Sequence, residues 1–107
     1  MSSPQATYYA ETCYLKSLTY PMIAASCSKE LPERREEFDA ALRAWQDRYA
    51  PHIERSKAHL ESTGYNFQGP MVRMAQNMAS TWVSSKVANG PAAVAETCDA
   101  HLADLRS

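Results

Sequence analysis

Four prolines divide this chain into long segments that contain no glycine. They are Pro4, Pro32, Pro70 and Pro91, and all three glycines fall in the links between the segments. Proline is favoured at the first position of a helix, because its missing N–H would have no partner there in any case. The links "CSKELP", "STGYNFQGP" and "NGP" contain the polar, glycine and proline residues that interrupt helices. The sequence therefore predicts four helices, at about residues 4–28, 32–62, 70–88 and 91–106.

Large apolar residues recur within three of these segments, mostly at steps of three or four, which is the spacing of one helix face. They are Phe38, Leu42, Trp45, Tyr49, Ile53 and Leu60 in the second segment, Met71, Met74, Met78 and Trp82 in the third, and Val94, Cys98, Leu102 and Leu105 in the fourth. No alternating pattern typical of strands competes with them, so the sequence predicts an all-α fold. We expect Trp45 and Trp82 to anchor the core, and the three methionines to pack within it.

The short links predict how the helices are arranged. Tight links make consecutive helices antiparallel neighbours, so the simplest fold is an up-down-up-down four-helix bundle. Pro21 and Pro51 lie inside the first and second segments, where each removes one backbone hydrogen bond. The apolar stripe continues beyond Pro51, which favours a kink there. At Pro21, a kink and a split into two helices are both open.

Three cysteines restrict the pairing of the helices. Cys13 and Cys27 lie 14 residues apart, or ~21 Å along a continuous helix, whereas a disulfide needs Cα atoms within ~7 Å. An antiparallel fourth helix brings Cys98 about midway between them, so spacing hardly discriminates. We expect a Cys27–Cys98 disulfide, because Cys27 adjoins a flexible link. Cys13 is then a buried thiol or the link of a homodimer. The alternative is three free thiols in a reducing compartment.

Length and charge restrict the classes of protein to which this chain could belong. A chain of 107 residues fits one domain, 1–107. Its 11 basic and 12 acidic residues give a net charge of −1, without the basic excess that nucleic-acid binding requires. No apolar run approaches the ~20 residues that span a membrane. The first residues lack a signal peptide but are small and polar, as at the start of a mature exported chain. Together with the cysteines, they lead us to expect a periplasmic or secreted protein.

Few residues are spaced for catalysis or metal binding. His52 and His59 share a helix face but lie ~10.5 Å apart along its axis, so they cannot easily hold one ion. We expect these two and His101 to be surface or edge residues. Met71, Met74 and Met78 offer thioethers that suit Cu(I), although core packing is the favoured interpretation. The sequence suggests no phosphate loop and no nucleophile–base pair, so we expect neither an enzyme nor a cofactor.

The longest link, "STGYNFQGP", carries the candidate binding residues. Aromatic side chains on a loop between rigid helices often anchor a partner, which makes Tyr65, Asn66 and Phe67 candidates for partner binding. The alternative is that both rings fold back and close the end of the bundle. The sequence favours a small exported protein that binds another protein, as inhibitor or immunity proteins do. The alternative functions are a carrier of a small hydrophobic ligand and a helical bundle that holds a soft metal or a cofactor.

Overall fold

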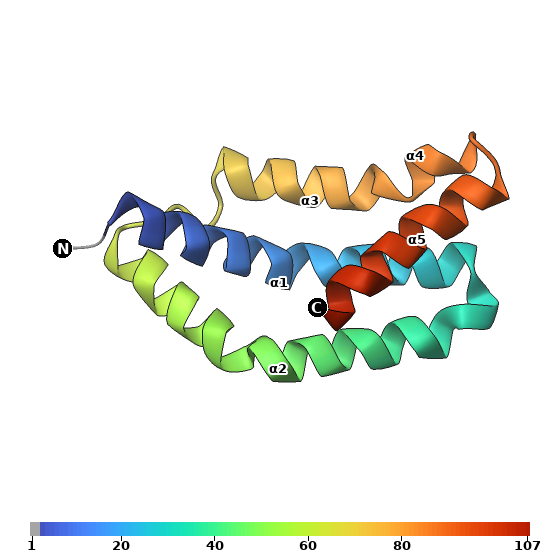
Figure 1. Ribbon diagram of the computed structural model, residues 1–107. Helices are drawn as coiled ribbons and strands as arrows, with labels where there is room; N and C mark the ends of the chain where they lie inside the picture. The colour runs from blue at the N-terminus through green and yellow to red at the C-terminus, as the bar shows by residue number, and fades with distance from the viewer. Residues whose placement is uncertain (1–2) are drawn as a thin grey trace.

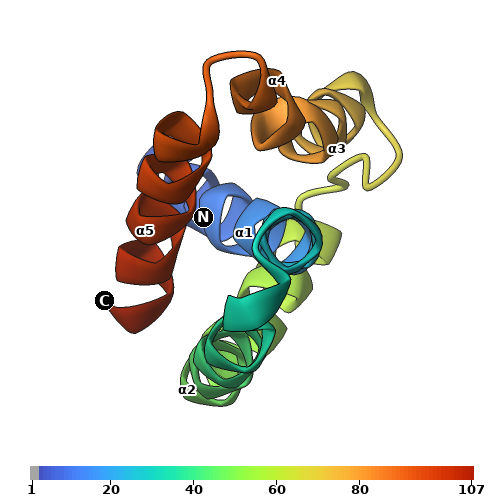
Figure 2. The same cartoon turned by 90° about the vertical axis from the view of Figure 1, so that its right-hand side faces the viewer.

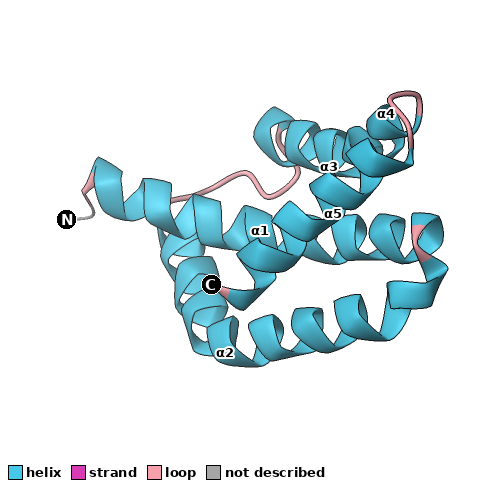
Figure 3. Cartoon of the chain, turned by 45° about the vertical axis from the view of Figure 1, so that its right-hand side comes forward, coloured by secondary structure: helices cyan, strands magenta, loops and turns pink. Residues whose placement is uncertain are grey.

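Each proline at the start of a segment lies in the first turn of a helix. The computed structural model describes residues 3–107, and within that range it consists of helices and their links (Figure 3). The Oγ of Ser3 accepts a hydrogen bond from the N–H of Ala6 at 3.0 Å, which caps the first helix. The helices are α1 (Pro4–Glu30), the 3₁₀ turn Pro32–Arg34, α2 (Arg35–Ser62), α3 (Pro70–Trp82), α4 (Ser84–Val87) and α5 (Pro91–Arg106).

This structure confirms the all-α prediction and most of the helix boundaries. The first helix continues to Glu30 instead of residue 28, and the segment predicted as one helix over 70–88 is interrupted at Val83. No helix of residues 3–107 is long and apolar enough to cross a membrane. The same residues hold no group of three or more His, Cys, Asp or Glu side chains that could bind a metal ion.

Helix α1 forms the centre of the molecule. Successive long helices run in opposite directions, and the molecule measures 48 × 27 × 19 Å (Figure 1). An end-on view shows α2, α3 and α5 arranged around α1 (Figure 2). Helix α5 also packs against α2, whereas the main contacts of α3 are with α1 and α4. One side of α3 is therefore left without a neighbouring helix.

Both internal prolines lie within continuous helices. Pro21 stands inside α1 and Pro51 inside α2, so the first segment does not split. Pro51 is exposed, and the backbone group that it leaves unpaired can be solvated there. Helix α2 changes direction along its length, as Figure 1 shows.

The core lies where α1, α2, α3 and α5 meet. Phe38 of α2 and Leu105 of α5 are completely buried, and Trp45 is 3% exposed, which confirms that Trp45 is a core anchor. Helix α3 contributes Ala79 and its C-cap residue Val83 to this core. The rings of Trp45 and Tyr20 lie 4.8 Å apart, centroid to centroid, so the tryptophan joins α2 to α1.

A disulfide joins the end of α1 to the middle of α5. The Cα atoms of Cys27 and Cys98 lie 5.8 Å apart and both residues are fully buried, which confirms the predicted pairing. Cys13 is free and half-buried.

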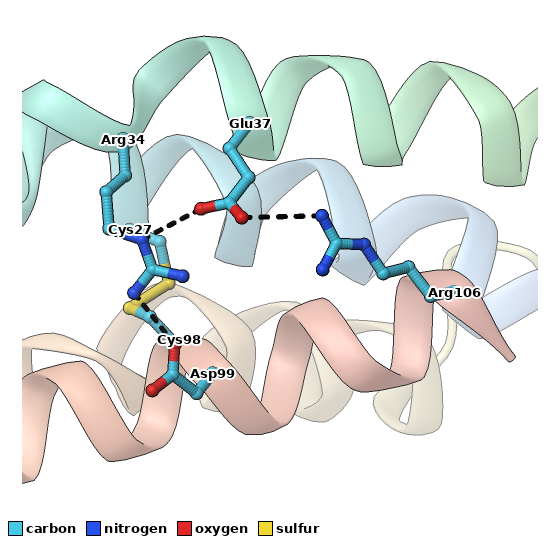
Figure 4. Close-up of polar contacts among 6 residues, drawn as sticks. All are labelled: Cys27, Arg34, Glu37, Cys98, Asp99 and Arg106. Carbon is cyan, nitrogen blue, oxygen red and sulfur yellow. Dashed lines mark hydrogen bonds and ion pairs between the residues drawn. A yellow bond between two sulfur atoms is a disulfide. The ribbon is translucent and has the colours of Figure 1, made fainter.

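Three ion pairs lie beside the disulfide (Figure 4). Arg34 donates to Glu37 at 2.9 Å and to Asp99 at 2.7 Å, and Arg106 reaches the other oxygen of Glu37 at 3.4 Å. Arg34 and Arg106 therefore connect the start of α2 to α5 beside the disulfide.

Candidate functional site

The exposed side of α3 carries four large apolar side chains in one row. Met71, Met74, Met78 and Trp82 are 49%, 50%, 65% and 40% exposed. We call this row the methionine face. The predictions that Trp82 anchors the core and that the three methionines pack within it are therefore wrong. Large apolar side chains gathered on an exposed face are typical of a binding surface.

Smaller residues on the same helix explain this exposure. Val72, Ala79 and Val83 are buried and lie about 100° around the helix axis from the methionine face. Their small side chains allow α3 to approach α1 closely. The apolar residues of α3 thus cover more of its circumference than α1 can contact, and the methionine face lies outside the α1–α3 contact.

A groove runs beside the methionine face. A cavity of about 510 Å³ lies between α3 and α1, with Thr19 and Ile23 of α1 among its lining residues and Met78 and Trp82 on the side of α3. No charged side chain lines it. Methionine side chains are flexible and polarizable, and they adapt to partners of different shape. The geometry suits an apolar segment of another molecule.

Trp82 also borders a second, smaller cavity. This cavity of about 350 Å³ extends from Trp82 and Lys86 to Ala93 and Thr97 of α5. The methionine face is therefore continuous, through Trp82, with a surface of small residues on α5. Between Glu61 and Glu96 the chain carries no acidic residue and only two basic ones, Arg73 and Lys86.

The loop residues Tyr65 and Phe67 fold back onto α1. Their rings lie 6.4 Å and 5.1 Å from the ring of Tyr14, centroid to centroid, and 5.2 Å from each other. Both side chains are half-buried. Burial, with Glu11 nearby, raises the pKa of Tyr65 to about 12. This packing favours the alternative in which the rings close the end of the bundle.

Asn66 is exposed beside these rings, and its Oδ1 accepts a hydrogen bond from the N–H of Gln68 at 3.1 Å. That bond shapes the turn that leads into α3. The partner-binding role of Tyr65, Asn66 and Phe67 stays a prediction, on a surface separate from the methionine face.

The three histidines occupy different environments. His52 is exposed and its Nδ1 accepts a hydrogen bond from Arg55 at 2.8 Å, whereas Nε2 of half-buried His59 lies 3.1 Å from the hydroxyl of Thr7. His101 was expected at the surface or an edge, and this expectation is wrong because its side chain is 1% exposed. Its position on the apolar stripe of the last helix, one residue before Leu102, was the signal for this burial.

Comparison with known proteins identifies no relative of this chain. No protein-family model, no curated protein and no solved structure matches this chain. The function is therefore inferred from the geometry of the molecule alone.

Proposed function

We propose that this chain is a small, non-catalytic, exported protein that binds another protein through the methionine face. The observation that carries this proposal is the exposure of three methionines and Trp82 in one row beside an uncharged groove. Aromatic residues and methionine are enriched in the centres of protein interfaces. The partner would contribute an apolar, uncharged segment to the groove between α1 and α3.

The area of the face favours a different protein over a second copy. The exposed parts of its four side chains equal about two whole large side chains, or roughly 400 Å² of apolar surface. Two copies paired through these side chains alone would bury roughly 800 Å², below the ~1,000 Å² of a specific interface. A partner that also contacts the groove and the small residues of α5 buries more.

The disulfide supports the exported location. Disulfides form and persist in oxidising compartments, and Cys27–Cys98 lies in the core of this small domain. The hydroxyl–imidazole pair Thr7–His59 supports no catalytic role, because nucleophilic hydroxyls need a base that a third group orients. Among the hydrogen bonds of residues 3–107, none joins His59 to a carboxylate.

The test compares two variants of α3 in capturing a partner from the native extract. Met74→Ser with Met78→Ser removes the centre of the methionine face, whereas Arg73→Ser changes an exposed residue on another side of the same helix. Circular dichroism and thermal melting establish that both variants are folded. The proposal predicts a protein that the wild type and Arg73→Ser retain and the double variant loses, and that binds the purified wild type directly.

Two results would contradict the proposal. One is the same set of captured proteins for the wild type and the double variant. The other is a dimer of the wild type in sedimentation equilibrium that the double variant does not form, which would assign the face to self-association.

A further inference from the structure

A second cavity system lies on the other side of α1, between its N-terminal half and the second half of α2. One cavity of about 550 Å³ is lined by Tyr9 and Cys13 of α1 and by residues 49–59 of α2. A neighbouring cavity of about 200 Å³ shares Tyr9, Cys13 and Tyr49 and extends to Tyr20 and Trp45. We call the two together the aromatic cleft. Helix α5 packs against both α1 and α2, and its last turn borders the cleft, where Asp104 and Ser107 line the smaller cavity.

Stacked rings form one wall of the aromatic cleft. Trp45 and Tyr49 stack with their centroids 5.1 Å apart and their planes at 28°. Tyr20 continues the row on one side, 4.8 Å from Trp45, and His52 on the other, 5.6 Å from Tyr49. Tyr9 lines both cavities from α1 and is 62% exposed. Flat aromatic surfaces are therefore offered from both helices, which suits a planar ring.

The larger cavity of the cleft is lined by one cation, Arg55, and, among residues 3–107, by no acidic side chain. In the smaller cavity, Lys16 lies among lining residues that include the carboxylate of Asp104. The guanidinium of Arg48 lies 5.6 Å from the centroid of Tyr49 and donates to the carbonyl of Leu105 at 2.7 Å. His52 adds a ring nitrogen, Nε2, which does not take part in its bond to Arg55. A cleft lined mostly by one sign of charge concentrates ligands of the opposite sign.

From this arrangement we propose that the aromatic cleft binds a small planar aromatic anion. The ring of the ligand lies against Tyr49 and Tyr9, and its acid group pairs with Arg55. Guanidinium groups suit carboxylates because they offer two parallel N–H donors. The larger cavity falls in the 300–1,000 Å³ range of small-molecule sites. This site is separate from the methionine face, and its ligand is independent of the proposed protein partner.

The two tryptophans allow the site to be tested directly, because each reports on one surface. Trp45 lies in the wall of the aromatic cleft and Trp82 in the methionine face. Their indole N–H groups give separate signals in a ¹H–¹⁵N spectrum. The probe is 2-naphthoate, and the uncharged control is 2-naphthamide. We expect 2-naphthoate to shift the signal of Trp45 and not that of Trp82.

Matched variants test the charge that the proposal requires. Arg55→Gln removes a cation of the cleft, and Arg73→Gln removes one from α3, away from it. A lost charge-assisted hydrogen bond should weaken 2-naphthoate binding about tenfold in Arg55→Gln. Arg73→Gln should bind as the wild type does, and 2-naphthamide should bind about tenfold more weakly than 2-naphthoate.

Three outcomes would overturn the proposal. The first is no shift of the Trp45 signal at about 5 mM 2-naphthoate, a concentration that detects even millimolar affinity. The second is equal binding of 2-naphthamide and 2-naphthoate, which would show that the site does not select an anion. The third is a shift confined to Trp82, which would place the probe on the methionine face.

Discussion

The imidazole of His101 meets the ring of Tyr20 edge-on, with 5.4 Å between their centroids. His101 is 1% exposed, and neither of its ring nitrogens has a hydrogen-bond partner within residues 3–107. Burial lowers the pKa of His101 to about 4, although the nearby carboxylate of Asp104 acts in the opposite direction. The core therefore holds this histidine in its neutral form.

We expect the stability of the protein to fall as the pH drops from about 6.5 to about 4. In that range the unfolded chain binds a proton at His101 that the folded chain does not, because the pKa is about 6.5 when unfolded and about 4 when folded. The free energy of unfolding therefore keeps its full value above pH ~6.5 and is about 3 kcal/mol lower at pH ~4. Urea unfolding at a series of pH values measures it.

His101→Leu is the control for this pH dependence. The variant should have a flatter stability profile between those pH values, with no loss of stability at pH 7, because a buried polar group without a partner is itself destabilising by about 1–3 kcal/mol. If the variant and the wild type lose stability in parallel on acidification, other groups account for the pH dependence.

The two tryptophans should respond differently to truncation. Trp45→Ala opens a cavity in the core and should lower the free energy of unfolding by roughly 3–5 kcal/mol. Trp82→Ala should cost less, roughly 2 kcal/mol, because 40% of the side chain is already exposed and only the rest contributes buried apolar area. Thermal melting of both variants measures the difference. Equal costs would contradict the outward position of Trp82.

The Cys27–Cys98 disulfide should be a major source of stability. It joins residues 71 apart in the sequence, so its loss in Cys27→Ala with Cys98→Ala should cost about 4 kcal/mol in the chain-entropy model. Titration of the unfolded, unreduced wild type should detect one thiol, that of Cys13. Three reactive thiols would contradict the disulfide and weaken the case for export.

The helices could be predicted because their signals are local. A proline at the first turn and apolar residues at three- and four-residue steps act within one segment, and they placed the last helix at its observed bounds, Pro91–Arg106. The disulfide followed from a distance that excludes Cys13–Cys27 in a continuous helix and from a preference for the cysteine beside a link. These inferences require no knowledge of how the helices are oriented about their axes.

The exposed face of α3 could not be predicted, because it depends on that orientation. Two apolar stripes compete on this helix, one with Val72 and Val83 and the other with Met78 and Trp82. Size alone favours burying the second. The structure buries the first, since α3 has one main helical neighbour, α1, and small residues allow the closer approach. The aromatic cleft was missed for a similar reason, because its residues come from helices that meet only in the fold.

The two candidate surfaces for a protein partner can be separated in one experiment. Tyr65→Ala with Phe67→Ala removes the rings that pack on Tyr14. Because these rings are half-buried, the loop variant should lose stability but keep its partner in the fraction that remains folded. Met74→Ser with Met78→Ser changes exposed side chains, so this variant should keep its melting temperature nearly unchanged.

The most direct test of the methionine face is the dissociation constant of the captured partner for these two folded variants, measured side by side with the wild type. We predict that the α3 variant loses about 2 kcal/mol or more of binding free energy, the level of an interface hot spot, while the loop variant binds as the wild type does. Wild-type affinity in the α3 variant, with binding lost in the loop variant, would contradict the account and place the interface at Tyr65 and Phe67.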